Sequence, residues 1–173
     1  MKFIQYLSVL LLLAGAFNGT PAQSQDVKLG DIVITQPWVR AAPKGSELTS
    51  SYLTIENKGA TANRLVGGSA DVAEKLQIQK TSKAGGATVA EPLVGGLEIA
   101  PGEKLALVPG SYKLALLKLK TKLKKGGQVP ISLEFEKGGK ITVSFDVLSP
   151  TATGPVTPKA SRNSVADDGK MKK

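Results

Sequence analysis

The chain has 173 residues, with 23 lysines and arginines against 14 aspartates and glutamates, and its formal charge is +9. It contains no cysteine and no histidine, which excludes disulfides, thiolate nucleophiles, zinc ribbons and imidazole-based catalysis. A chain of this length has room for one domain with an adequate hydrophobic core and for additional segments.

The amino terminus has the pattern of an export signal. Lys2 supplies a positive charge, Val9–Ala16 form an apolar stretch, and small residues lead to a cleavage point after Ala22. The apolar stretch is shorter than the roughly 20 residues that a membrane-spanning helix needs. We therefore expect residues 1–22 to be a signal peptide and the mature protein to lie in the periplasm. Because there is no cysteine to acylate, we expect no lipid anchor.

Between Asp26 and Leu148, apolar and polar residues alternate along several short segments separated by glycine-rich turns. Period-two alternation is typical of half-buried antiparallel strands. The predicted strands are Ile32–Ile34, Tyr52–Glu56, Leu76–Gln79, Lys104–Val108, Ile131–Glu136 and Ile141–Val147. The predicted core residues are Trp38, Tyr52, Leu53, Ile55, Leu65, Leu76, Ile78, Leu105, Leu107, Leu114, Leu116, Leu133, Phe135, Val143 and Phe145. This spacing predicts an all-β domain, a two-sheet sandwich or a small Greek-key barrel.

The segment Lys113–Lys125 holds six lysines in thirteen residues, interleaved with leucine. In one interpretation it is a solvated edge strand, with Leu114 and Leu116 facing inward and a bulge near Leu116 and Leu117 that returns Leu119 to the inside. The residues then expected to face outward are Lys113, Ala115 and Leu117. In the other interpretation its lysines form a basic patch for anionic lipid or a polyanion. The patch would comprise Lys113, Lys118, Lys120, Lys122, Lys124 and Lys125. We favour the solvated strand.

The carboxyl-terminal segment Ser149–Lys173 contains three prolines and no sustained apolar period. We expect it to be a disordered basic tail. No aromatic residue interrupts the lysines of Lys113–Lys125, so we expect no nucleic-acid partner.

Motifs for catalysis are absent from the sequence. It contains no phosphate-binding loop, no dinucleotide fingerprint and no serine-lysine nucleophile pattern. Glu134 and Glu136 share one face of a predicted strand, where alternating charges usually mark the solvated side. We therefore predict that the protein is not an enzyme.

Several blocks, in order, resemble the periplasmic copper chaperone family PCu(A)C. The blocks are 27–30, 32–40, 41–45, 51–59, 63–69, 96–101, 107–112 and 123–135. The resemblance implies a cupredoxin-like β-sandwich over residues 26–148. It also implies that Cu(I) is carried at one end and passed to cytochrome oxidase or to a partner chaperone.

The chain departs from that family at the metal site. The resemblance places the family's histidine and methionine ligands at Gln79, Ala90, Lys113 and Ala115. Cu(I) is a soft ion that prefers thioether or imidazole donors. Alanine has no donor, an amide is a poor match and a protonated ammonium cannot act as a ligand. We therefore expect no intact metal site and no bound cofactor.

Three hypotheses for function remain open. The first is an exported, monomeric protein of copper homeostasis or cytochrome oxidase assembly that binds a copper-assembly partner without holding Cu(I). The second is a copper chaperone that uses other donors, such as Met171. The third is a basic module that binds anionic membrane or envelope polymer. We favour the first.

Overall fold

The structure is a computed structural model that describes residues 26–155. The predicted signal peptide and residues 156–173 of the predicted tail lie outside this range. All the regular elements in the described range are strands, and no helix there is long and apolar enough to cross a membrane. The strands are β1 (Val27–Leu29), β2 (Ile32–Arg40), β3 (Leu48–Asn57), β4 (Asn63–Ser69), β5 (Ala73–Ala84), β6 (Ala87–Pro92), β7 (Leu97–Ile99), β8 (Lys104–Leu107), β9 (Tyr112–Leu119), β10 (Gln128–Phe135) and β11 (Gly139–Leu148).

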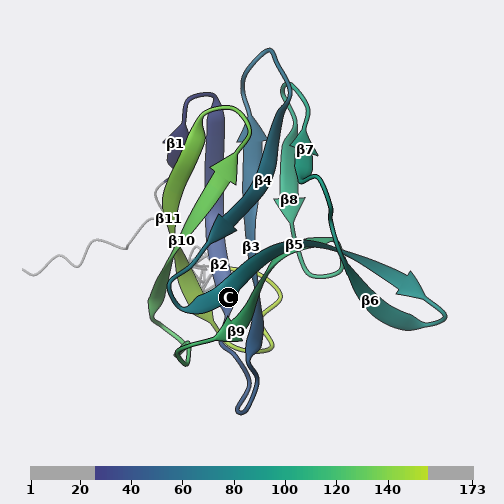
Figure 1. The fold of residues 1–173 in the computed structure, drawn as a ribbon, viewed down its shortest axis with the longest axis vertical. Helices are drawn as coiled ribbons and strands as arrows, with labels where there is room; N and C mark the ends of the chain where they lie inside the picture. Colours follow the sequence, from purple (N-terminus) through teal and green to yellow (C-terminus); the bar gives the residue numbers. More distant parts are fainter. Residues whose placement is uncertain (1–25, 156–173) are drawn as a thin grey trace, which may run out of the picture.

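The strands form one continuous hydrogen-bonded path in the order β6-β5-β9-β3-β2-β11-β10-β4-β7. β1 pairs with β2, and β8 pairs with β3 beside β9. Neighbouring strands along the path are antiparallel except for β11 and β2, which are parallel. The path curls into two layers that enclose the core, and the β5–β6 hairpin extends from the body (Figure 1). The predicted all-β sandwich is therefore confirmed.

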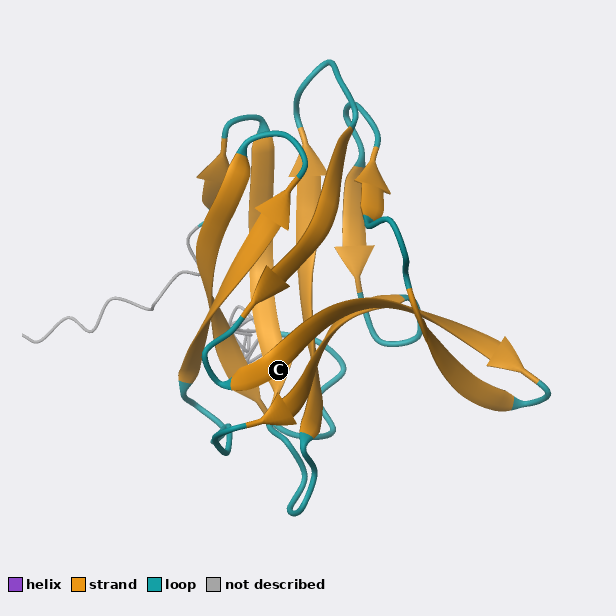
Figure 2. Ribbon diagram, viewed as in Figure 1, coloured by secondary structure: helices purple, strands orange, loops and turns teal. Residues whose placement is uncertain are grey.

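Alternation along the strands builds this core. β10 places Val129, Ile131, Leu133 and Phe135 inside, and β11 places Val143, Phe145 and Val147 opposite them. Of the fifteen predicted core residues, thirteen are buried, while Leu76 and Leu105 are only partly buried against the core. Figure 2 shows β10 and β11 side by side in one layer, where they pair antiparallel.

The strand β9 lies inside the sheet, which corrects one prediction. Its residues pair with β5 on one side and with β3 on the other. A segment with partners on both sides is not a solvated edge, so the interpretation of Lys113–Lys125 as an edge strand is wrong for its first half. The interior position also explains why Ala115, expected to face solvent, is only 2% exposed.

The predicted bulge near Leu116 and Leu117 is wrong as well. The pairing of β9 with β5 continues without a shift through Leu116 and Leu117. The irregular residue is Lys118, whose φ is 52°, in the left-handed region. This turn of the backbone leaves Leu119 packed on the core and Lys118 and Lys120 exposed, as the sequence predicted.

Beyond β11 the chain stays against the sandwich for several residues. The Arg40 side chain donates a hydrogen bond from Nε to the carbonyl oxygen of Ala152, at 2.9 Å. The Ala152 amide in turn donates to the Ser149 carbonyl, at 3.1 Å. Residues 149–152 therefore remain attached to the end of β2.

One buried polar side chain joins β3 to its neighbours. Asn57 is 2% exposed, and its Nδ2 donates to the carbonyls of Thr61 and Ile99, at 2.9 and 3.0 Å. Its Oδ1 accepts the Gly59 amide at 3.0 Å. A buried carbonyl that loses its donor is costly, because water cannot replace it.

We predict that Asn57→Ala lowers the free energy of unfolding by about 2–4 kcal/mol. The matched control is Asn63→Ala, which also removes three hydrogen bonds, but at a position that is only partly buried. Water can replace those bonds, so the control should cost less than about 1.5 kcal/mol. Urea unfolding of both variants measures the difference, and equal losses would contradict the assignment of Asn57.

Candidate functional site

The four positions that the resemblance singled out lie on one face of the β6-β5-β9 part of the sheet. Gln79 of β5 pairs directly with Lys113 of β9. Directly paired residues and residues two apart on a strand share a face. Ala115 therefore lies on the face of Lys113. Ala90 pairs with Thr81, two residues beyond Gln79, and joins the same face.

The side chains at these positions offer few atoms that could ligate a metal ion. Gln79 donates from Nε2 to Oε1 of Gln77, at 3.0 Å, so its amide is engaged with a neighbour on its own strand. Ala90 is exposed, and Ala115 is buried. Lys113 is the one charged side chain of the four, and it is half-buried.

A second cation, Arg40, belongs to the same face. Ser50 of β3 pairs with Ala115, and Tyr52 lies two residues beyond Ser50. Tyr52 pairs with Trp38, and Arg40 lies two residues beyond Trp38. The face of Lys113 therefore continues across β3 to Arg40 on β2.

Arg40 is held in place by its hydrogen bond to Ala152 and by a contact with Tyr52. Its guanidinium carbon lies 5.5 Å from the centre of the Tyr52 ring, a cation–π distance. That ring packs on Trp38 with 4.5 Å between the ring centres. The Trp38 and Tyr52 rings are 3% and 2% exposed. The prediction that Trp38 is a buried core or sheet-corner residue is therefore confirmed.

The local electrostatics disfavour an added positive charge. Partial burial is the main cause that lowers the pKa of Lys113, and the positive charge of Arg40 lowers it further. The ion pairs of the described residues include neither Lys113 nor Arg40. The contribution of Arg40 could not be predicted from the sequence, because the pairing that brings β2 and β9 to one face is not local.

The described range contains no methionine, cysteine or histidine, the side chains that a soft metal ion prefers. Both methionines, Met1 and Met171, lie outside it, and the chain has no cysteine or histidine. Residues 26–155 hold no group of three acidic, cysteine or histidine residues that could share an ion. Neither soft nor hard protein ligands are therefore gathered at this face.

The six lysines of the predicted basic patch do not form one cluster. Lys113 lies on the face described above, and Lys118 makes an ion pair with Glu74 at 2.9 Å. Lys120, Lys122 and Lys124 line a separate cleft beside the β2–β3 loop. Lys125 is exposed next to this cleft. The predicted patch did not include the β2–β3 loop, which forms the other wall of this cleft.

Comparison with known proteins decides the family. A family model described as "Putative lipoprotein LpqE-like" matches residues 32–147. The chain belongs to the LpqE-like family. A relative from Leifsonia xyli subsp. xyli (strain CTCB07), named "Putative lipoprotein Lxx21020", is 30% identical over 142 residues, which are 81% of this LpqE-like chain and 84% of the relative.

Solved structures similar to this LpqE-like protein are PCuAC domains. The apo PCuAC domain from PmoF1 is 27% identical with a TM-score of 0.64, and the match covers 73% of this chain and 100% of that domain. The Cu(I) form of DR1885 from Deinococcus radiodurans is 26% identical with a TM-score of 0.55, over 75% of this chain and 85% of that protein. The resemblance found in the sequence thus extends to the fold.

We predict that Arg40→Gln raises the pKa of Lys113 toward the ordinary value of 10.5, because it removes the second cause of the depression. Burial, the larger cause, remains, so the return should be partial. Nuclear magnetic resonance titration of the lysine side-chain carbons measures the pKa. A Lys113 pKa that stays unchanged or falls in the variant would contradict the proximity of the two cations.

Proposed function

We propose that this protein is an exported, non-enzymatic member of the LpqE-like family that has the fold of the PCuAC copper chaperone domain but does not carry Cu(I). Its role in copper homeostasis would then rest on contact with a copper-assembly partner. The observation that carries the proposal is the half-buried Lys113 on the face shared by Gln79, Ala90 and Ala115.

Donor chemistry is the first support. Cu(I) is held by thioether, thiolate or imidazole groups, and residues 26–155 contain none of these side chains. An amide oxygen and an aliphatic methyl group cannot replace them.

Electrostatics are the second support. An ion about 4 Å from a lysine ammonium would be repelled by about 1 kcal/mol in water and by about 4 kcal/mol at an effective dielectric constant near 20. Arg40 adds repulsion from the same face, since its charge already acts on Lys113. A monovalent cation at this face would therefore meet two fixed positive charges and no compensating ligand.

We predict that the mature protein takes up no stoichiometric Cu(I). The measurement is a titration against bicinchoninic acid, a coloured Cu(I) chelator, under reducing conditions. The chelator should retain its copper in the presence of the protein. Transfer of one Cu(I) per chain would contradict the proposal and favour a chaperone that uses other donors.

The assignment of the positions can be tested by restoring donors. We predict that the triple variant Gln79→His, Ala90→Met, Lys113→His binds one Cu(I) per chain, because it places three soft donors on one face and removes a cation. The matched control places the same donor types at scattered exposed positions: Lys28→His, Val94→Met and Lys104→His. A double variant that retains Lys113 should bind more weakly than the triple variant. Equal binding by the triple variant and the scattered control would contradict the assignment.

A further inference from the structure

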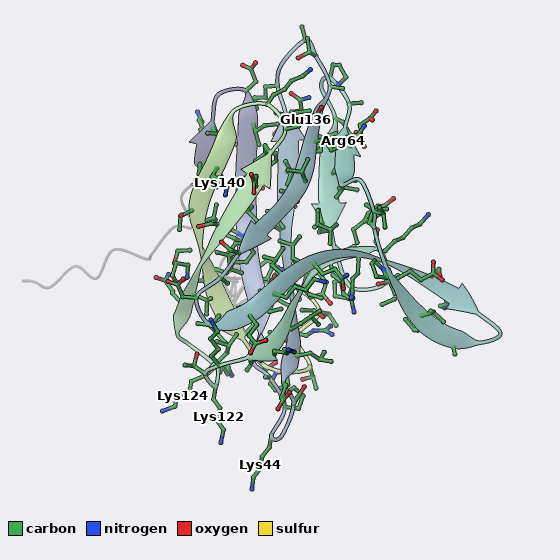
Figure 3. The ribbon with its side chains drawn as sticks, in the orientation of Figure 1. Lys44, Arg64, Lys122, Lys124, Glu136 and Lys140 are labelled. Carbon is green, nitrogen blue, oxygen red and sulfur yellow. The ribbon has the colours of Figure 1, made fainter. Side chains whose placement is uncertain are left out.

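A cleft of about 530 Å³ lies at the end of the sandwich away from β1 and β7. One wall is the β2–β3 loop, with Lys44 and Glu47, and the other is the β9–β10 loop, with Lys120, Lys122 and Lys124. Figure 3 shows Lys44, Lys122 and Lys124 projecting from this end of the molecule. The cleft is distinct from the face of Gln79 and Lys113, which does not contribute to its lining.

The walls of this cleft are fixed by the backbone and the core. The Leu119 amide donates to the Glu47 carbonyl at 2.9 Å, which joins the two loops. The Lys120 amide donates to Val72, and the Gly126 amide donates to Val147, both at 2.8 Å. Between these anchors Leu123 is only 8% exposed and packs in the core. The lysines on either side of Leu123 are therefore presented by an anchored loop.

Lysines outnumber acidic residues in the lining of this cleft. Lys44, Lys120, Lys122 and Lys124 take part in none of the ion pairs of residues 26–155, and Glu47 is the one acidic residue that lines the cleft. Residues 119–133, which include the β9–β10 loop, contain four lysines and no acid. By contrast, the other end pairs Lys58 with Glu56, Arg64 with Glu98, and Lys140 with Glu134.

The same end also exposes apolar surface. Leu48, at the start of β3, is 55% exposed, and it borders a smaller cleft that shares Pro43 and Ser46 with the larger one. Leu119 and Leu123 give the larger cleft an apolar part. Lysines around an exposed leucine are typical of surfaces that bind at a membrane interface, whereas a soluble polyanion needs only the charge.

We propose that this basic end, formed by Lys44, Leu48, Lys120, Lys122 and Lys124, docks on a membrane rich in anionic phospholipid. A headgroup phosphate occupies the cleft between the loops, and Leu48 enters the interface. The 173 residues contain no cysteine, so membrane contact by these residues is non-covalent. The proposal is independent of whether the protein binds copper.

The contribution of the lysine charges to membrane binding is tested by sedimentation of the mature protein with vesicles of phosphatidylglycerol and phosphatidylcholine. The triple variant Lys44→Gln, Lys122→Gln, Lys124→Gln should bind on the order of 100-fold more weakly, because each lysine near an anionic surface contributes about fivefold. The matched control, Lys28→Gln, Lys58→Gln, Lys104→Gln, loses the same charge near the other end. Equal losses in the two variants, or no binding by the parent protein, would overturn the proposal.

Lipid is distinguished from polyanion by the apolar contact. Leu48→Ser should weaken vesicle binding about tenfold and leave binding to soluble polyphosphate unchanged, because only the membrane interface can bury the exposed part of this leucine. Val94→Ser is the control, because Val94 is 94% exposed elsewhere, between β6 and β7. If Leu48→Ser has no more effect than Val94→Ser, or if the parent protein binds polyphosphate but not vesicles, the membrane assignment is wrong.

Discussion

The register of β9 between β5 and β3 determines which of its side chains enter the core and which lie on the opposite face. It turns Leu114 and Leu116 into the core and places Lys113 opposite Gln79 on the other face. It also extends that face across Tyr52 to Arg40, so that two cations come together. The same strand contains the irregular Lys118, ends at Leu119 and continues into the lysine-rich loop of the basic end. One strand therefore contributes to the core, to the face of Gln79 and Lys113, and to the cleft.

In the described residues the hydrophobic core is separate from the face of Gln79 and Lys113. A single cluster of aliphatic and aromatic side chains from both layers fills the interior, and hydrogen bonds such as those of Asn57 satisfy its polar groups. Small domains whose structural metal supplies the folding energy unfold when they lose it. Here the face of Gln79 and Lys113 lies outside the core cluster, so its residues can change without loss of the sandwich. That separation explains how an LpqE-like chain can have the fold of PCuAC domains with no soft donor in residues 26–155.

Much of the fold could be predicted because it follows from local alternation. Ile131–Glu136 and Ile141–Val147 have strict alternation, and they became β10 and β11. β6 was missed because all six of its residues are exposed, so no burial pattern marks it. The interior position of β9, the contribution of Arg40 and the second wall of the cleft were also missed. Each depends on which distant strand or loop lies alongside, and local sequence does not encode that information.

The central claim is that the PCuAC fold persists here without its cargo. The most direct measurement is the metal content of the protein isolated from its native compartment under anaerobic, reducing conditions, with copper and protein quantified on the same sample. The account predicts copper far below one atom per chain. One firmly held copper per chain would contradict it and would show that donors beyond the face of Gln79 and Lys113 hold the ion.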